Sequence, residues 1–158
     1  MKKTLRNLVF VLAALMVLAV LSGCGGGIED TNGETDFTLQ TITDADIIEG
    51  MNTMSFMSSQ SSVTVNGVSK NKISVGTMSG VMELYEGRLN NESLTVVLSG
   101  SVTKGNARIV VVLENEIVHD FELNAADQSF TLENARGRVY IKIAGESAGF
   151  SVEYTAEK

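Results

Sequence analysis

The chain has 158 residues, 44% of them hydrophobic, and a formal net charge of −7 at pH 7. One histidine, one cysteine and no tryptophan leave few side chains for nucleophilic catalysis, metal binding or aromatic recognition. An acidic chain of this kind repels phosphate backbones, so we expect no nucleic-acid binding.

The first 24 residues have the parts of an export signal. Three of the first six residues are basic, and an unbroken apolar run follows over residues 8–21. This run is shorter than the roughly 20 residues that a membrane-spanning helix needs, and it fits the apolar part of a cleaved signal peptide. The segment Leu21-Ser22-Gly23-Cys24 resembles the lipobox of bacterial lipoproteins. The resemblance implies cleavage before Cys24, lipid on its thiol, and a location at the bacterial cell membrane or outer membrane, facing away from the cytoplasm.

Cleavage at this point divides the chain into three parts. Residues 1–23 form the signal peptide, residues 24–36 a flexible glycine-rich and acidic tether, and residues 37–158 one folded domain. From Cys24 onward 9 Lys and Arg face 19 Asp and Glu, which gives a net charge of −10. No thiol is left for a disulfide once Cys24 carries lipid, so the domain depends on packing alone.

A short helix is predicted near the start of the domain. Thr43 is followed by acids at positions 44 and 46, which is typical of a helix N-cap. The apolar residues that then fall on one helical face are Ile47, Ile48, Met51 and Met54. Gly50 weakens this helix by about 1 kcal/mol relative to alanine.

From Val63 onward the apolar residues alternate with period two, which indicates β-strands. Turn signals recur at Asn66-Gly67, Asn90-Asn91, Lys104-Gly105, Asn115, Ala125–Asp127 and Arg136-Gly137. Their spacing predicts an all-β fold, an antiparallel β-sandwich of jelly-roll or immunoglobulin-like type with about seven to nine strands. We expect a strand through Val139–Ala144 to pair with one through Phe150–Thr155 across a five-residue turn.

The turn at residues 145–149 satisfies the pattern Gly-x-Ser-x-Gly and is similar to the nucleophile elbow of carboxylesterases. That elbow needs a helix after the serine, and an acid and a histidine later in the chain. Here a strand is predicted after Ser147, and the single histidine, His119, precedes it. We therefore predict a hairpin turn and no enzyme activity.

His119 shares the strand parity of Ile117, Phe121 and Leu123. A second histidine that could share a metal ion is lacking in the sequence. We expect His119 at the edge of the core, where it is neither a general base nor a metal ligand.

Met51, Met54 and Met57 have the spacing Met-x-x-Met-x-x-Met, which resembles methionine-rich segments of exported copper-handling proteins. On a helix these residues fall within about 120° of arc. The same arc suits docking against a sheet, because methionine is an adaptable core residue. Core packing is the expected role and a Cu(I) site the alternative, and no cofactor is predicted.

Val110 and Val112 give a second apolar face to a strand whose other face points to the core. We expect residues 43–57 to cover this second face, with a partner as the alternative. Tyr85 and Tyr140 are candidates for exposed aromatic side chains, which would permit glycan binding.

We predict a non-catalytic binding or structural module of the cell envelope, held to the membrane by its lipid anchor. The prediction rests on the export signal and on the lack of a recognisable catalytic or cofactor motif in the sequence. A protein or a glycan of the envelope is the expected partner. A Cu(I)-handling lipoprotein and a glycan-binding accessory domain are the alternatives.

Overall fold

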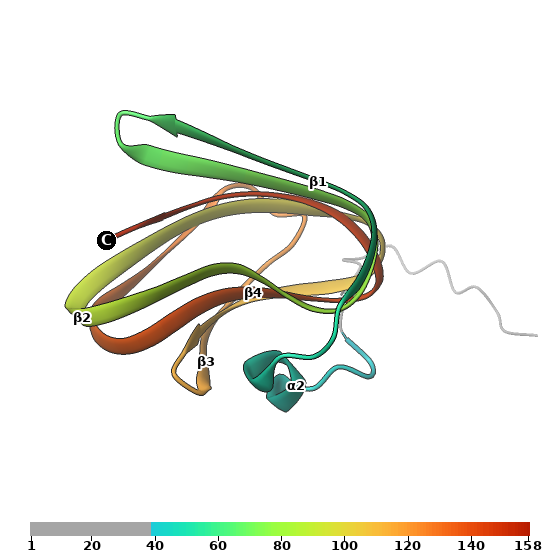
Figure 1. The fold of residues 1–158 in the computed structure, drawn as a ribbon, viewed down its shortest axis with the longest axis horizontal. Helices are drawn as coiled ribbons and strands as arrows, with labels where there is room; N and C mark the ends of the chain where they lie inside the picture. Colours follow the sequence, from blue (N-terminus) through green and yellow to red (C-terminus); the bar gives the residue numbers. More distant parts are fainter. Residues whose placement is uncertain (1–38) are drawn as a thin grey trace, which may run out of the picture. The chain divides into compact units, whose positions relative to one another are not determined.

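The structure, a computed structural model, describes residues 39–158. These residues form α2 (Asp44–Glu49), β1 (Met54–Val65), β2 (Val68–Leu113), β3 (Glu116–Phe121) and β4 (Gln128–Glu157) (Figure 1). Every pairing between the strands is antiparallel, which confirms the predicted all-β class. The predicted signal peptide, Cys24 and the predicted tether lie outside the described residues.

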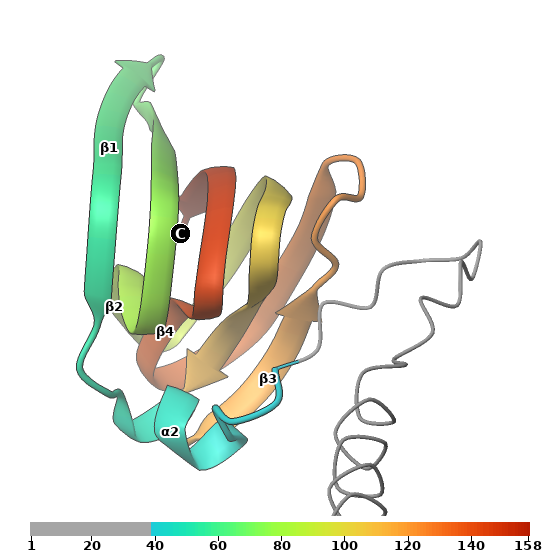
Figure 2. The same ribbon diagram turned by 90° about the vertical axis from the view of Figure 1, so that its right-hand side faces the viewer.

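The two long strands, β2 and β4, bend strongly and pair with each other twice. In one run, residues 71–98 of β2 lie opposite residues 128–154 of β4. In the other, residues 95–113 of β2 lie opposite residues 139–157 of β4. The middle of β4 therefore has β2 on both sides, and the sheet curls instead of staying flat (Figures 1 and 2).

This pairing overturns the hairpin predicted inside β4. Val139–Ala144 pair with residues 81–87 and 108–113 of β2, and Phe150–Thr155 pair with other parts of the same strand. Between them the chain stays in β4 and bends near Ser147, whose φ is 52°. The two apolar segments are thus consecutive parts of one bent strand, because each pairs with residues of β2 that are far away in the sequence.

Turn-forming residues mark bends inside strands as well as loops. The hairpin at Asn66-Gly67 is confirmed, with φ values of 54° and 85° and Val65 opposite Val68, as a type I′ turn requires. Gly105, in contrast, lies inside β2 with φ 63°. A Cβ at Gly105 would lie 2.5 Å from the carbonyl oxygen of Glu146, so only glycine fits where the two bends cross. Residues 39–158 therefore contain four strands, fewer and longer than expected.

One large core is shared by β2, β3 and β4. Its fully buried members include Leu94, Val96, Leu98, Ile109, Val111, Val139, Ile141 and Ile143. These residues alternate along their strands, as a half-buried sheet requires. The alternation read from the sequence therefore identified most of this core correctly.

A second, smaller cluster lies between α2 and the opposite face of the same strands. Val110 and Val112 are fully buried there together with Ile47 of α2. Figure 2 shows α2 beside the curled sheet at the end where β3 lies. The sequence predicts that residues 43–57 cover these valines, and Ile47 and Ile48 of that segment do so, together with Leu39 and Ile42 just before it.

α2 begins where the sequence predicts. The Thr43 hydroxyl accepts the backbone N–H of Asp46 at 3.3 Å, and the Asp46 carboxylate accepts the backbone N–H of Thr43 at 2.8 Å. The helix ends at Glu49, one residue before Gly50, whose φ is 82°. The capping box thus fixes the start, and glycine ends the helix before Met51 can join it.

A bulge in β3 separates apolar residues that were expected to share a face. The ladder with β2 places His119 opposite Val111 but Ile117 opposite Val112, which leaves one extra residue on β3. Ile117 consequently packs in the α2 cluster, whereas Phe121 packs in the main core. The predicted common parity is wrong, because one inserted residue reverses the side on which the next residues lie.

Candidate functional site

His119 lies at the edge of the main core, as predicted. Its ring stacks on Phe130 with centroids 4.1 Å apart and meets Phe121 edge-on at 4.6 Å. Partial burial lowers the pKa of His119, although the Asp120 carboxylate acts in the opposite direction. Within residues 39–158 no group of three His, Cys, Asp or Glu side chains is placed to hold a metal ion.

Ser147 lies exposed at the bend of β4. Its backbone N–H donates to the hydroxyl of Ser79 at 3.0 Å. The chain continues from Ser147 as strand to Glu157, so the strand–turn–helix geometry of a nucleophile elbow is absent at this serine.

The methionine spacing does not produce a helical stripe. Met51 follows the end of α2 and is 43% exposed, and Met54 begins β1 and is 66% exposed. Core packing is therefore the wrong prediction for both residues. Met57 belongs to β1 as well, so the helical arc that suggested a copper site is not formed.

None of the four candidates for a binding surface is openly exposed. Val110 and Val112 are covered by α2 and cannot form an open binding face. Tyr85 is half-buried against the main core. Tyr140 is half-buried in the α2 cluster, with the Lys142 ammonium 5.0 Å from its ring centroid. Neither tyrosine forms the exposed platform typical of glycan binding.

Three arginines, which sequence reasoning missed, gather on one face of β2 and β4. Arg88 lies directly opposite Arg138, and the next outward-facing pair is Asn90 and Arg136. The residues between them on β2 and β4 are buried in the main core or are glycine, so these side chains face away from it. All three arginines are exposed. We refer to Arg88, Arg136 and Arg138 as the arginine cluster.

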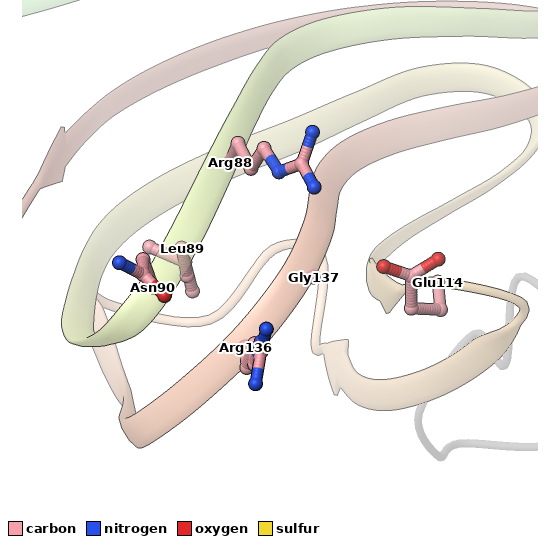
Figure 3. A pocket seen from close by; sticks show the side chains of 6 residues that line it. All are labelled: Arg88, Leu89, Asn90, Glu114, Arg136 and Gly137. Atoms are coloured by element: carbon pink, nitrogen blue, oxygen red, sulfur yellow. The ribbon is translucent and has the colours of Figure 1, made fainter.

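A pocket of about 430 Å³ lies at the arginine cluster (Figure 3). Its lining residues are Arg88, Leu89, Asn90, Glu114, Arg136 and Gly137. The Glu114 carboxylate accepts the backbone N–H of Arg138 at 2.8 Å and supplies the one negative charge among these lining residues. Within residues 39–158, no arginine of the cluster lies within 4.0 Å of a carboxylate oxygen.

A carboxylate of β4 holds the chain just before α2. Glu146 accepts the backbone N–H groups of Gln40 at 2.9 Å, Thr41 at 2.5 Å and Ile42 at 3.0 Å, and the Thr41 hydroxyl at 2.6 Å. Desolvation raises the pKa of Glu146, but these hydrogen bonds outweigh it and lower the pKa to about 2. The partners are more than 100 residues apart in the chain, so no local pattern predicts this contact.

Lys142 of β4 is hydrogen-bonded to the C-terminal end of α2. The buried Lys142 ammonium donates to the carbonyl oxygens of Ile47 at 3.0 Å and Ile48 at 2.6 Å. These carbonyls lie in the last turn of α2, where a positive charge also complements the helix dipole. We refer to Glu146 and Lys142 together as the α2 clasp.

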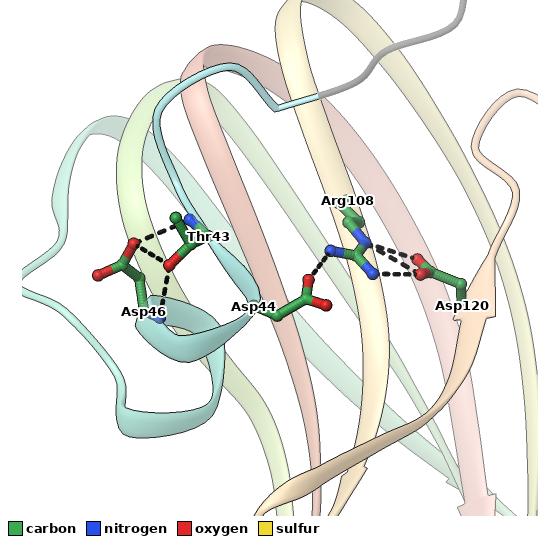
Figure 4. Close-up of polar contacts among 5 residues, drawn as sticks. All are labelled: Thr43, Asp44, Asp46, Arg108 and Asp120. Carbon is green, nitrogen blue, oxygen red and sulfur yellow. Dashed lines mark hydrogen bonds and ion pairs between the residues drawn. The ribbon is translucent and has the colours of Figure 1, made fainter.

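An ion-pair network adds a third attachment (Figure 4). Arg108 of β2 donates to the Asp120 carboxylate of β3 at 2.6 and 2.9 Å, and also to the carboxylate of Asp44 in the first turn of α2. The hydrogen bond with Asp120 raises the pKa of Arg108 most strongly, against desolvation and with help from Asp44. Arg108 therefore links α2 to two strands at once.

The strand β1 lacks the features that usually protect a sheet edge. It pairs with β2 along one side, and among the described strands it has no neighbour on the other. Its 12 residues contain no charge and no proline, and the uncharged stretch extends from Gly50 to Ser69. Val63 and Val65 are 59% and 61% exposed. Natural edge strands usually carry lysine, proline or a bulge, so this edge is open to pairing.

The hairpin turn determines which backbone groups of β1 are free. In a two-residue hairpin the residues next to the turn, here Val65 and Val68, exchange both hydrogen bonds. Hydrogen-bonded and non-hydrogen-bonded pairs then alternate along the ladder. Ser62 and Gln60 consequently point their N–H and C=O groups outward, toward the empty side of β1.

The edge formed by β3 is protected by comparison. β3 has six residues, carries a bulge, and includes the charged residues Glu116 and Asp120. These are the devices that block strand addition elsewhere. The contrast makes the free edge of β1 the strongest candidate for a binding surface in the described part of the chain.

Comparison with models of known protein families finds no match to this chain, and comparison with curated proteins finds none either. Between residues 39 and 158 there is no helix with the length and apolar character needed to cross a bilayer.

Proposed function

We propose that this chain is a non-catalytic binding module of the bacterial cell envelope, held to the membrane by lipid on Cys24. Its binding surface is the free edge of β1, which takes up an extended segment of a partner protein as an added strand. The observation that carries this proposal is the 12-residue, uncharged, unpaired edge. The lipobox at residues 21–24 supports the anchor.

The physical basis of the binding is backbone hydrogen bonding. An added strand satisfies the outward N–H and C=O groups of β1, and its side chains can pack on exposed residues such as Val63 and Val65. The partner segment is expected to be uncharged or basic. Residues 39–158 carry 15 Asp and Glu against 9 Lys and Arg, so an acidic segment would be repelled by the domain before it reached the neutral edge.

We also propose that the curled sheet is a two-layer β-sandwich. In support, Ile73 and Val152 lie in one stretch of paired strand and Ile109 and Ile141 in another, yet all four belong to the same buried cluster. Two stretches that bury side chains against each other in this way are typical of two facing layers. This arrangement leaves β1 at an edge, where a partner can reach it.

Site-specific photo-crosslinking in intact cells tests the binding proposal. A photoreactive amino acid replaces Gln60 at the free edge, and in a control it replaces Asp127, an exposed loop residue far along the chain. We expect an adduct with another envelope protein from position 60 and none from position 127.

A blocking variant makes this test specific to the edge. Ser62→Pro removes one outward N–H but leaves the hydrogen bonds to β2 in place, since proline is tolerated where the N–H faces away from the ladder. Ser62→Ala keeps the N–H and serves as the matched control. The adduct should disappear in Ser62→Pro, with little change in melting temperature, and persist in Ser62→Ala. An adduct that survives the proline, or one formed only with a second copy of this chain, would contradict the proposed partner.

A further inference from the structure

The arginine cluster is a concentration of positive charge on an acidic domain. It contains three of the nine Lys and Arg among residues 39–158, although the same residues carry 15 acids. Other cations of the domain form ion pairs with carboxylates: Lys70 and Lys72 contact Glu153 at 2.7 and 2.9 Å. The arginine cluster has no such partner within 4.0 Å in the described chain.

The placement of the cluster carries an energetic cost. Arg88 and Arg138 are directly opposite each other on neighbouring strands, where Cα atoms are about 4.5–5.5 Å apart. Like charges in this position destabilise a sheet. Arg136 adds a third guanidinium one pair further along. Tyr140, Glu86 and Glu114 favour the charged form of Arg138 and raise its pKa, which offsets part of this repulsion, and an anion bound beside Arg88 and Arg136 would offset it further.

We propose that the arginine cluster and its pocket bind a phosphate-bearing anion. Guanidinium groups donate paired hydrogen bonds that match the oxygens of a phosphate, and both Arg88 and Arg136 line the pocket, with Arg138 opposite Arg88 on β4. The Asn90 side chain, which lines the same pocket and lies opposite Arg136, supplies a neutral amide donor. The pocket of about 430 Å³ has room for one or two phosphate groups.

Glu114 limits the affinity of the pocket for an anion, so its removal should have the opposite effect to the removal of an arginine. Its carboxylate lines the same pocket, so it repels an anion bound there. Removing this charge should strengthen binding, whereas removing an arginine should weaken it. If anion binding depended only on the net charge of the protein, removing any cation would weaken it and removing any carboxylate would strengthen it, wherever the residue lies.

Calorimetric titration of the full-length lipoprotein in nonionic detergent with inorganic pyrophosphate tests the proposal. We expect Arg88→Gln and Arg136→Gln each to weaken binding by about tenfold or more, and Glu114→Gln to strengthen it. The control Lys104→Gln removes an exposed cation outside the cluster and should change nothing. Without pyrophosphate, Arg88→Gln should melt at the same temperature as the parent protein or higher, which shows that the loss of binding is not a loss of fold.

Nanodiscs distinguish two sources of the phosphate group. If the ligand is a lipid headgroup, discs of phosphatidylglycerol should reduce pyrophosphate binding to the parent protein compared with discs of phosphatidylcholine, because headgroups occupy the cluster. If the ligand is soluble, the parent protein should bind pyrophosphate with the same affinity in both discs, measured at an ionic strength that screens the surface charge of the disc. Either result supports the site. Absence of pyrophosphate binding, or equal affinities for the parent protein, Arg88→Gln and Arg136→Gln, would overturn it.

Discussion

The half-buried carboxylate of Glu146 organises the chain just before α2. Three backbone N–H groups and one hydroxyl, all from residues 40–42, donate to its two oxygens. Backbone N–H groups outside helices and strands need a side chain or water as acceptor. Glu146 supplies them from a strand more than 100 residues later, so the start of the folded domain depends on β4 being in place.

We expect Glu146→Gln to lower the free energy of unfolding by about 1–2 kcal/mol at pH 7, because an amide offers one acceptor where the carboxylate offers two charged oxygens. The folded pKa of about 2 lies below the ordinary 4.5, so the charged form stabilises the fold above pH 4.5. This contribution disappears as the pH falls from about 4.5 to about 2. Urea denaturation of both proteins across this range measures it.

Glu157→Gln provides the control, since Glu157 is exposed at the end of β4. It should unfold with nearly the same midpoint as the parent protein at every pH. A difference between parent and Glu146→Gln that stays constant down to pH 2 would show that Glu146 does not act through its charge.

At the scale of elements, α2 depends on its contacts. A helix of six residues is too short to persist alone in water. The α2 clasp holds its two ends, Arg108 holds its first turn, and Ile47 is fully buried above Val110 and Val112. Because the helix has little stability of its own, losing one attachment should loosen all of it.

We expect Ile47→Ala to destabilise the domain by about 2–5 kcal/mol, since it leaves a cavity above two buried valines. Met54→Ala, at a residue that is 66% exposed, should change the unfolding free energy by no more than about 0.5 kcal/mol. Chemical denaturation measures both variants. Equal effects of the two substitutions would contradict this difference in burial between Ile47 and Met54.

The elements that sequence reasoning predicted correctly are those decided locally. The capping box at Thr43 and the turn at Asn66-Gly67 depend on a few neighbouring residues, so their composition is sufficient. Val139–Ala144 look like a hairpin partner of Phe150–Thr155, but strand pairing depends on distant segments with equally apolar patterns. Alternation alone cannot choose between these partners.

The candidate sites also divide into those that neighbouring residues reveal and those that depend on distant strand pairing. Val110 and Val112 could be identified as a second apolar face, and even their cover could be predicted, because they stand out in the pattern of one strand. The arginine cluster could not, since Arg88 and Arg138 lie 50 positions apart and meet only through the register of β2 and β4. The bulge in β3 gives no signal in composition either.

At the scale of the whole molecule, the two proposed surfaces have opposite chemistry. The edge of β1 is uncharged and offers backbone groups, whereas the arginine cluster is cationic and offers side chains. A folded domain with excess negative charge keeps other acidic molecules at a distance, so these two surfaces are where contact is least opposed. Attachment to a membrane would restrict the partners to those within reach of it.

We expect Cys24→Ser to abolish lipid attachment and to block cleavage of the signal peptide. The altered protein should therefore run at a higher apparent mass and incorporate no labelled palmitate in growing cells. Metabolic labelling with electrophoresis measures both properties. Ser147→Ala, which changes an exposed serine at the bend of β4, should be processed and labelled like the parent protein. Equal labelling of Cys24→Ser would rule out this anchor.

The α2 clasp also determines how the domain responds to mechanical load. Everything upstream is joined to the described domain through residue 39, so tension on that end reaches the hydrogen bonds of Glu146 before any strand. Residues 40–42 are held by one carboxylate, and these bonds can be pulled away one after another. The β2–β4 ladder, in contrast, shares force among many bonds. We therefore expect moderate tension on the upstream chain to peel α2 from Val110 and Val112 while the curled sheet stays folded, which would expose an apolar face under load.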